Sequence, residues 1–462
     1  MKTTMPSNPI FIIAATLLLA PGLSTMGCSG DVTTGDGETG YDPVSTEGCA
    51  TPVQDAVDTA SWPEIFIGTT ADGCSDGEGA GTASVPFCNP HLAMASVTTA
   101  KTIVTFLDGV YRLSEFHRSD GTTGGVSLPR VSSSTAGEFV VIRAAANARP
   151  VLVGSVPLSG DWTEYSQSPR VFRTSVSGLS NDVRGLWLLD GELGLDTPVR
   201  RPRHVTMSID GTRSHADVAN LADDDETGFA ETSMTESAEN RDFTWTKADE
   251  SGTSCSDAND GCYVYLRIDD TAIDPGTLTF EAGQSAAMGG GSHYMVIDGL
   301  HTRFTQAPSG QNSSAWFEGL DHVLIQNASF GHIANSNENA YALGIWFSQG
   351  SIIRNNQFFD AAYWGGTPNS KGLTFMCGGQ IEPNWACGNE IFHIPGDAGI
   401  GSKGGEENLR VIGNYLHDCQ TCVQVSEHRD QDGEAYPGGG WQIQQNVFQR
   451  CHTGVMLGTG HE

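Results

Sequence analysis

The six residues Ile353-Arg354-Asn355-Asn356-Gln357-Phe358 decide the fold, because the same phrase returns along residues 294–460. Each copy has an aliphatic residue, two variable residues, a small or amide residue, one further residue and an apolar residue. Other copies begin at Ile297, Ile325, Val411 and Ile443, with a degenerate copy at Ala386. Successive copies begin roughly 30 residues apart, a spacing typical of repeat architectures.

A second group of residues repeats in step with the first. Its copies are Gly344–Phe347, Gly372–Phe375, Gly399–Ser402, Cys422–Val425 and Gly454–Leu457. Each repeat therefore holds at least two short strands with alternating apolar residues, separated by corners rich in Gly, Asn and Ser. Strand-bearing repeats of this length predict coils stacked along an axis. The main rival is a β-propeller, whose blades need roughly 40–45 residues. We therefore predict an all-β right-handed parallel β-helix, a solenoid, with an N-terminal cap helix and an inserted region.

Asparagine recurs at one corner of the repeat, at Asn356, Asn389, Asn414 and Asn446. Asparagine tolerates the left-handed backbone conformation of a tight corner, and its amide can bond the next asparagine of a stack. The column predicts an asparagine ladder running through the coils.

The charge balance excludes one class of partner. There are 55 acidic and 24 basic residues, a formal charge of −31. Nucleic-acid binding rests on Lys and Arg contacts to phosphate, so this balance argues against it. The same balance argues more weakly against polyanionic glycans, unless a local basic spot or bound cations such as Ca²⁺ mediate the contact.

The first residues have the pattern of an export signal. Lys2 supplies the charged end, residues 10–19 supply the apolar core, and small residues lead to Gly27-Cys28. Cys28 resembles the lipid-attachment cysteine of bacterial lipoproteins, with Thr25 where that motif usually has Leu. We expect an exported protein at the cell surface or outer membrane, touching a membrane only through a lipid anchor. Plain secretion and a retained membrane anchor are the alternatives.

Composition divides the chain into five segments. The prediction is a signal peptide at 1–28, a flexible tether at 29–60, the N-terminal cap and first coils at 61–155, inserted or elaborated coils at 156–292, and further coils at 293–462. An uncapped coil end would expose unpaired backbone, so we expect either a partner that covers the end or a C-terminus that is incomplete. Incompleteness is the favoured reading.

Cysteine usage predicts disulfides. The chain has 11 cysteines, so an even number remains once Cys28 is set aside. The proposed local pairs are Cys74–Cys88, Cys255–Cys262 and Cys377–Cys387, and Cys419–Cys451 is the proposed bond between adjacent coils. A redox motif at Cys419–Cys422 is the weaker alternative.

The N-terminal part resembles a known family. A strand at residues 62–67 is followed by a Gly-rich loop, Pro86-Phe87-Cys88, a short helix near 91–96, a strand at 103–107 and Asp108-Gly109-Val110-Tyr111. This order resembles the N-terminal cap and first coils of pectate-lyase-like β-helix proteins, which include several polysaccharide lyase families. The resemblance covers residues 62–155 and 294–460. It implies a fold more than a substrate, since one fold hosts many activities.

Candidate catalytic residues follow from their place in the repeat. Counting from the second group places Lys403, Glu427 and His428 at one edge of adjacent coils. In the lyases that the chain resembles, Lys or Arg is the base, and Ca²⁺ or Arg neutralises the substrate carboxylate. The resemblance thus implies Lys403 or His428 as base and Arg354 or Arg410 as carboxylate partner. Alternatively, Lys403 is a solvated corner lysine paired with an acidic neighbour.

Further residues could bind sugar or metal. Asp430, Asp432 and Glu434 resemble part of a Ca²⁺ loop, although an acidic surface loop is the simpler interpretation. Trp346, Trp364, Tyr436 and Trp441 could stack on sugar rings or fill the coil interior.

We therefore expect a carbohydrate-active protein that cleaves a uronic-acid-containing polysaccharide by β-elimination. Hydrolysis would need a carboxylate pair and is the weaker enzymatic hypothesis, because the clustered Asp motifs of polygalacturonases do not occur in the sequence. The alternative from another class is a non-catalytic surface protein that binds glycan, adheres or serves as a scaffold.

Overall fold

A computed structural model divides the chain into two compact units, residues 1–41 and 42–462. The structure describes residues 48–158, 162–167, 170–189, 191, 193–196, 199–200, 203–204, 206–209, 212–215, 217–221, 243–255, 259–268, 270–306, 313–334, 340–361, 370–376, 378–379, 381–403, 405–429, 435–436 and 439–459. In these residues, we find no helix with the length and apolar character that a membrane span requires.

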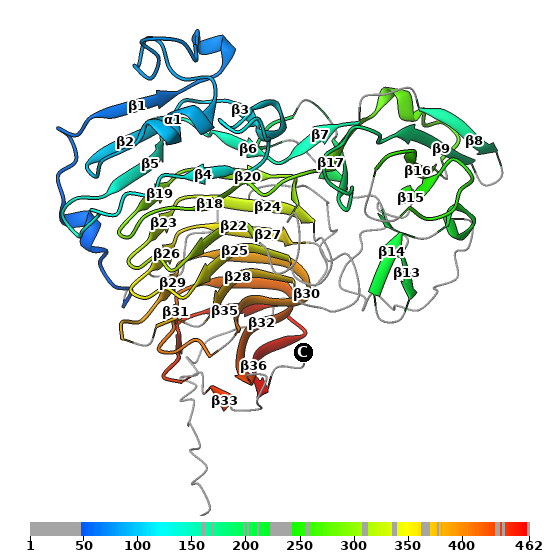
Figure 1. The fold of residues 1–462 in the computed structure, drawn as a ribbon. Coiled ribbons are helices and arrows are strands. Elements are labelled where there is room, and N and C mark those ends of the chain that lie inside the picture. Colours follow the sequence, from blue (N-terminus) through cyan, green and yellow to red (C-terminus); the bar gives the residue numbers. More distant parts are fainter. Residues whose placement is uncertain are drawn as a thin grey trace, which may run out of the picture. The chain divides into compact units, whose positions relative to one another are not determined.

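Parallel strands stack into three faces, which confirms the predicted right-handed parallel β-helix (Figure 1). The first face is a single parallel sheet of nine strands. In order along the stack they are β1 (Glu64–Ile67), β2 (Thr102–Phe106), β5 (Val140–Ala144), β19 (Val296–Asp298), β23 (Leu324–Gln326), β26 (Ile352–Arg354), β29 (Trp385–Cys387), β31 (Arg410–Ile412) and β34 (Gln442–Gln444).

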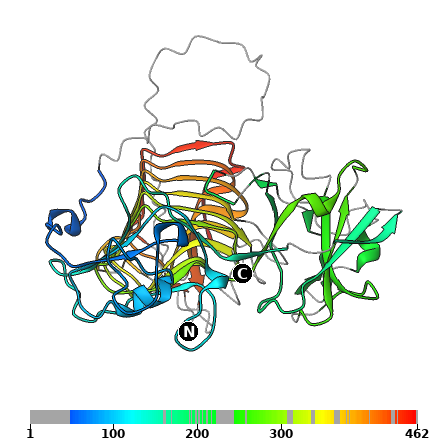
Figure 2. The same ribbon diagram turned by 90° about the horizontal axis from the view of Figure 1, so that it is seen from above.

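The second and third faces are joined because β30 (Glu390–Lys403) and β32 (Tyr415–Arg429) each run through both. The second face also contains β3 (Val110–Arg112), β6 (Val151–Val153), β20 (His301–Arg303), β21 (Thr305–Gln306), β24 (Ser329–Ala334), β27 (Gln357–Ala361) and β35 (Val447–Gln449). The third face contains β4 (Val126–Leu128), β18 (Met288–Gly290), β22 (Ser313–Glu318), β25 (Ala340–Trp346), β28 (Ser370–Met376) and β36 (Thr453–Thr459). Figure 2 shows the rungs of successive coils lying side by side.

The repeat phrase sets the register of the first face. Ile297, Ile325, Ile353, Ala386, Val411 and Ile443 pair in that order, as the repeat predicts. The first five are fully buried in the coil interior. In the second group one copy is misaligned: Gly344 pairs with Thr374, so the predicted match of Gly344 to Gly372 is wrong by two residues. Both candidate registers point the same alternate residues inward, so alternation alone could not choose between them.

The asparagine ladder forms as predicted, but the left-handed corner residue is its neighbour. Asn356 donates to Asn389 at 3.1 Å, and Asn389 to Asn414 and Asn414 to Asn446 at 2.9 Å each. The residues with positive φ are those just before the ladder, namely Gly299, Asn327, Asn355, Gly388, Gly413 and Gln445. The ladder asparagines thus satisfy buried backbone groups, while the preceding residue turns the chain.

Residues 49–57 lie against the outer surface of the first face. Cys49 is bonded to Cys387, and Asp55 is paired with Arg354 at 3.0 Å. Asp55 belongs to the short helix η1 (Val53–Ala56). The expected Cys377–Cys387 bond is therefore wrong, since the partner of Cys387 comes from more than 300 residues away in sequence; Cys377 lies outside the described residues. Sequence spacing carries no information about such a contact.

The structure contains the Cys74–Cys88 and Cys255–Cys262 bonds. The expected Cys419–Cys451 bond is wrong, because Cys451 is bonded to Cys422 with a Cα–Cα distance of 5.8 Å. Cys419 is a buried free thiol. Cys419 and Cys422 lie three residues apart, and both face the interior. The sequence therefore could not show which of the two is bonded to Cys451 of the neighbouring coil.

An antiparallel β subdomain interrupts one coil between β6 and β18. One of its sheets contains β7 (Ser155–Pro157), β17 (Thr279–Gly283), β10 (Leu186–Leu189) and β11 (Val199–Arg200). A second contains β8 (Thr163–Gln167), β9 (Arg170–Ser175), β16 (Cys262–Ile268), β15 (Phe243–Asp249) and β12 (Arg203–His204), and β13 (Thr206–Ile209) pairs with β14 (Thr212–His215). The subdomain has its own apolar core, which includes Phe172, Trp245, Leu266 and Phe280. The coil has already resumed at Met288, which pairs with Val126 of β4.

Buried polar contacts join the subdomain to the coil. Arg112 of β3 donates to both carboxylate oxygens of Glu281 of β17, at 2.7 and 2.8 Å. Glu281 is 1% exposed and also accepts from the Ser155 hydroxyl. The Gln306 side chain accepts from the backbone N–H of Arg184 at 2.9 Å.

The first coil carries helix α1 (Pro90–Ser96), which contacts β1 and β4. Asn89 caps the helix by accepting from the N–H of His91, and Ala93 and Met94 reach the coil interior. Other short helical turns are η2 (Thr70–Asp72), η3 (Leu113–Glu115), η4 (Val218–Leu221) and η6 (Pro275–Thr277).

Candidate functional site

At the edge of the second face, one residue in each of several successive coils has a left-handed backbone conformation. These residues form a column from coil to coil, and most of them carry polar side chains. The column runs through Phe304, His332, Asp360, His393, Asp418 and Arg450, all with φ near +50°. Asp and His tolerate this conformation better than bulky residues do. The corner geometry therefore gathers imidazoles, carboxylates and a guanidinium along one edge.

Beside this edge, aromatic rings stack from coil to coil on the outer surface. Phe359 lies 5.1 Å from Phe392, and Phe392 lies 5.0 Å from the ring of His417, with nearly parallel planes. These residues are in register in adjacent strands, and all three are partly exposed. We call Phe359, Phe392 and His417 the aromatic ladder. Its exposed ring edges form an apolar strip with a polar border, suited to an amphipathic ligand such as an extended glycan.

His417 lies at the centre of the densest polar cluster on this surface. Its Nδ1 is 2.6 Å from Asp418 Oδ2, and its Nε2 is 3.4 Å from Glu390 Oε1. The Tyr415 ring stacks on the imidazole at 4.4 Å, and the Tyr415 hydroxyl donates to Gln449. We call Glu390, Tyr415, His417, Asp418 and Arg450 the His417 site.

Asp418 links the imidazole to a cation. Arg450 donates to both Asp418 carboxylate oxygens at 2.6 Å, while 55% of the Arg450 side chain stays exposed. Burial acts to raise the pKa of Asp418, but hydrogen bonds from Arg450 and His417 outweigh it and hold that pKa below its usual value. An ionised Asp418 accepts from His417 Nδ1–H and orients the ring so that Nε2 faces the Glu390 carboxylate at 3.4 Å. The cluster thus combines an imidazole between two carboxylates, a phenol hydroxyl and an exposed guanidinium.

His332 and Asp360 form a second imidazole–carboxylate pair at 2.8 Å, two coils before Asp418 in the same column. The His332 ring stacks on Phe304, whose side chain packs under subdomain residues. This pair therefore lies beside the subdomain, and the His417 site lies further along the coils.

The residues predicted from the repeat are spread over several faces. Lys403 ends β30, where it pairs with Met376 on the third face. Glu427 and His428 lie late in β32, and His428 pairs with Tyr436 of β33 (Ala435–Tyr436). Trp364, Asp430, Asp432, Glu434 and Cys28 lie outside the described residues. No group of metal-ligating side chains occurs in the part of the chain that the structure describes.

Arg354 and Arg410 lie in strands of a different face from that of Lys403. Both belong to the first face, where Arg354 binds Asp55 and Gln326, and Arg410 donates to the carbonyl of Gly440. The two tryptophans have different surroundings: Trp346 packs against Trp316 on the third face, whereas Trp441 donates to the backbone of Glu406.

Sequence reasoning missed His417 and Arg450. One signal was present: the residue just after the apolar end of each repeat phrase is Phe359, Phe392 and His417 in three consecutive coils. Aromatic rings that repeat at an outward-facing position do not contribute to the core. Such a column therefore indicates a surface that binds something else.

Glu406 has a structural position at a corner between coils. It is fully buried, and it accepts from the N–H of Gly378 at 2.6 Å and from Asn384 at 2.8 Å. Burial raises the pKa of Glu406 to about 7, against the lowering effect of these two hydrogen bonds.

The folded state therefore favours protonated Glu406, and its contribution to stability is complete below the ordinary carboxyl pKa. We expect about 3 kcal/mol of unfolding free energy to be lost as the pH rises from about 4.5 to above 7. Urea unfolding across this range measures the loss, and the Glu406→Gln variant should lack that part of the pH dependence. Parallel pH profiles for the two proteins would contradict the assignment.

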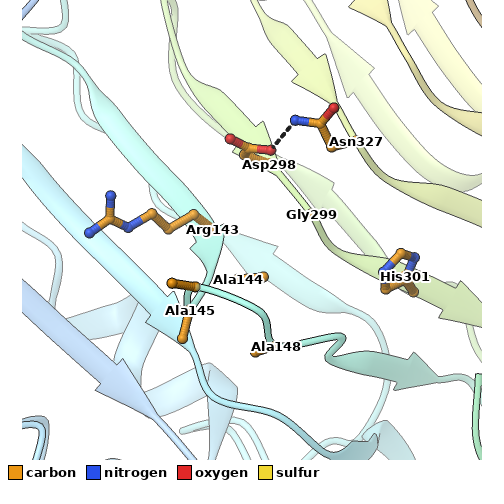
Figure 3. Close-up of a pocket in the computed structure, with 9 residues that line it drawn as sticks. Arg143, Ala144, Ala145, Ala148, Asp298, Gly299, His301 and Asn327 are labelled. Atoms are coloured by element: carbon orange, nitrogen blue, oxygen red, sulfur yellow. Dashed lines mark hydrogen bonds between the residues drawn. The ribbon is translucent and has the colours of Figure 1, made fainter.

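A pocket of about 510 Å³ opens at the corner between the first and second faces (Figure 3). Ala144, the last residue of β5, lines it together with Ala145 and Ala148 of the following segment. Asn327 donates to Asp298 at 2.8 Å on one side, and His301 lies on another. Gln326 also donates to Asp298 at 2.9 Å, so the carboxylate is held in place.

His301 is a neutral imidazole at physiological pH. Its Nδ1 is 2.7 Å from the Ser329 hydroxyl. Burial, followed by the positive charges of Arg303 and Arg149, lowers the pKa of His301 to about 4. Arg143, at the rim, donates to Glu64 at 3.0 Å.

Comparisons with known proteins show the fold. No protein-family model matches the chain, and no curated protein matches it. A structure of XylC in complex with xylose is 15% identical with a TM-score of 0.53, covering 85% of this chain and 63% of the other. Pectate lyase Pel9A (9% identity, TM-score 0.36, 82% and 71% covered) and a family 28 exopolygalacturonase of Yersinia enterocolitica (11%, 0.34, 86% and 61%) are also similar. The likeness to XylC is a likeness of fold, and this chain spans less than two thirds of the XylC chain.

Proposed function

We propose that this chain is an exported protein that binds a uronic-acid-containing glycan along the aromatic ladder and cleaves it by β-elimination at the His417 site. The observation that carries the proposal is that one carboxylate, Asp418, holds an imidazole and an exposed guanidinium side by side. XylC, whose fold is similar, was solved with xylose, which supports carbohydrate as the first ligand class to test.

The proposed reaction needs a base, a cation and an acid. Arg450 would pair with the uronate carboxylate, which lowers the cost of removing the proton on the adjacent C5 carbon. His417 Nε2 would take that proton, the C5 electrons would form the C4–C5 double bond, and the C4–O bond would break. The Tyr415 hydroxyl would protonate the leaving oxygen. Glu390, 3.4 Å from Nε2, would stabilise the imidazolium that forms.

Three further properties belong to the proposal. Export and lipid attachment at Cys28 would place the protein at the cell surface. Ca²⁺ could bridge the acidic protein to an acidic polymer, in addition to Arg450. Lys403, in register with Met376 in the neighbouring β28, is kept as a second candidate base.

The test is to incubate the exported domain with a panel of uronic-acid and neutral polymers, with and without Ca²⁺. Beta-elimination creates a double bond conjugated to a carboxylate, so ultraviolet absorbance should rise only with uronic-acid polymers. New reducing ends without absorbance would show hydrolysis and contradict the proposed reaction. Binding without any cleavage by the folded protein would leave the alternative, a glycan-binding surface protein.

A further inference from the structure

The pocket of Figure 3 lies on the same track as the His417 site. The outward column of the second face runs in register through His301, Ser329, Gln357, Glu390 and Tyr415. Four strand spacings separate His301 from Tyr415, which is roughly 19 Å. Ser329 is 2% exposed, so a glycan extended along the coils from the pocket to the His417 site would pass over this position without contacting it.

The track is closed at the pocket end. The next outward residues of the column, Val151 and Val110, pack against Leu193 and Leu195 of the subdomain. Nearby, Arg149 forms a two-point ion pair with Asp196 at 2.7 and 2.9 Å. A glycan that runs along the column from the His417 site therefore stops at the pocket.

The lining of the pocket favours an uncharged, hydroxyl-rich group. Asp298 and Asn327 together offer acceptors and an amide donor, and His301 adds a neutral imidazole. The Asp298 carboxylate would repel an anionic ligand, and Arg143, the guanidinium in the lining, is already paired with Glu64. The alanine methyl groups supply an apolar floor, and the volume falls within the roughly 300–1,000 Å³ of small-molecule sites.

We infer that this pocket is a subsite for a terminal neutral sugar residue of the glycan. The statement that the pocket binds the end of a glycan rests on the proposed function, whereas the affinity of the pocket for a neutral sugar does not. A protein with this subsite would prefer chains that end in a neutral sugar and would release products of uniform length.

The chain offers a matched pair of variants. Asn327 and Asn355 occupy the same left-handed corner position in adjacent coils, and glycine stands at that position in other coils, as at Gly299, Gly388 and Gly413. Asn327→Gly therefore removes a pocket side chain without backbone strain. Asn355→Gly makes the same change at a residue that does not line the pocket.

Calorimetric titration with galactose, xylose and galacturonate tests the inference. We expect weak binding of at least one neutral sugar, a loss of about tenfold in Asn327→Gly and no change in Asn355→Gly. Tighter binding of galacturonate, equal binding by both variants, or no binding of any of these sugars would overturn it. Titration of the His417→Phe variant keeps the two proposals apart. The pocket should still bind its sugar in this variant, so sugar binding tests the pocket alone, and the cleavage assay tests His417.

Discussion

Replacing Glu281 by alanine should lower the free energy of unfolding by about 3 to 5 kcal/mol. The change removes the two buried carboxylate acceptors of the Arg112 guanidinium, whose side chain is 14% exposed, and leaves it the Ser155 carbonyl at 3.1 Å. The guanidinium would then lose its buried counter-ion where the subdomain joins the coil and keep only the Glu115 carboxylate, which lies 3.6 Å away and is 68% exposed. Equilibrium urea unfolding, followed by circular dichroism, measures the effect.

The exposed pair Arg149–Asp196 is the matched control, because it has the same two-point geometry with side chains 47% and 66% exposed. Asp196→Ala should cost less than about 1 kcal/mol. The double variant Arg112→Ala/Glu281→Ala should be less destabilised than the sum of its single changes, since no lone charge remains. Similar costs for Glu281→Ala and Asp196→Ala would show that burial of the first pair is unimportant.

Replacing His417 by phenylalanine should lower the rate of the proposed elimination by about 100- to 10,000-fold, because the base is lost. Phenylalanine keeps an aromatic ring for stacking on Phe392, so the aromatic ladder and glycan affinity should be retained. Initial rates at saturating polymer, together with a separate binding measurement, distinguish lost chemistry from lost binding.

His117→Gln is the control for this variant, because His117 is exposed and belongs to the first coils, outside the His417 site. Its activity should equal that of the unchanged protein. Lys403→Ala tests the base expected from the repeat. Full activity in His417→Phe with inactivity in Lys403→Ala would assign the base to Lys403 and remove His417 from the mechanism.

Much of the coil could be predicted because a β-helix repeats one set of physical constraints. Aliphatic residues at Ile297, Ile325 and Ile353 must all face the interior, so equal spacing in sequence becomes register in space. The asparagine ladder followed for the same reason, since a buried amide at one corner needs an equivalent partner in the next coil.

The candidate site could not be predicted in the same way. Counting along the repeat shows which residues are equivalent in successive coils, but it does not show to which of the three faces they belong. Arg354 was therefore grouped with Lys403, although the two residues lie on different faces. His417, Asp418 and Arg450 come together because a left-handed corner turns Asp418 towards both neighbours. No sequence motif records that turn.

The sequence alone therefore determined the stacking of coils, the inward apolar columns and the local Cys74–Cys88 and Cys255–Cys262 pairs, because each depends on neighbours in sequence or on the repeat period. Only the tertiary structure decided the Cys49–Cys387 bond, the Arg112–Glu281 contact and the separation of the predicted site residues. These depend on which outer surface each distant segment covers. Side chains at outward positions need not be buried, so the repeat does not determine which distant segment covers them.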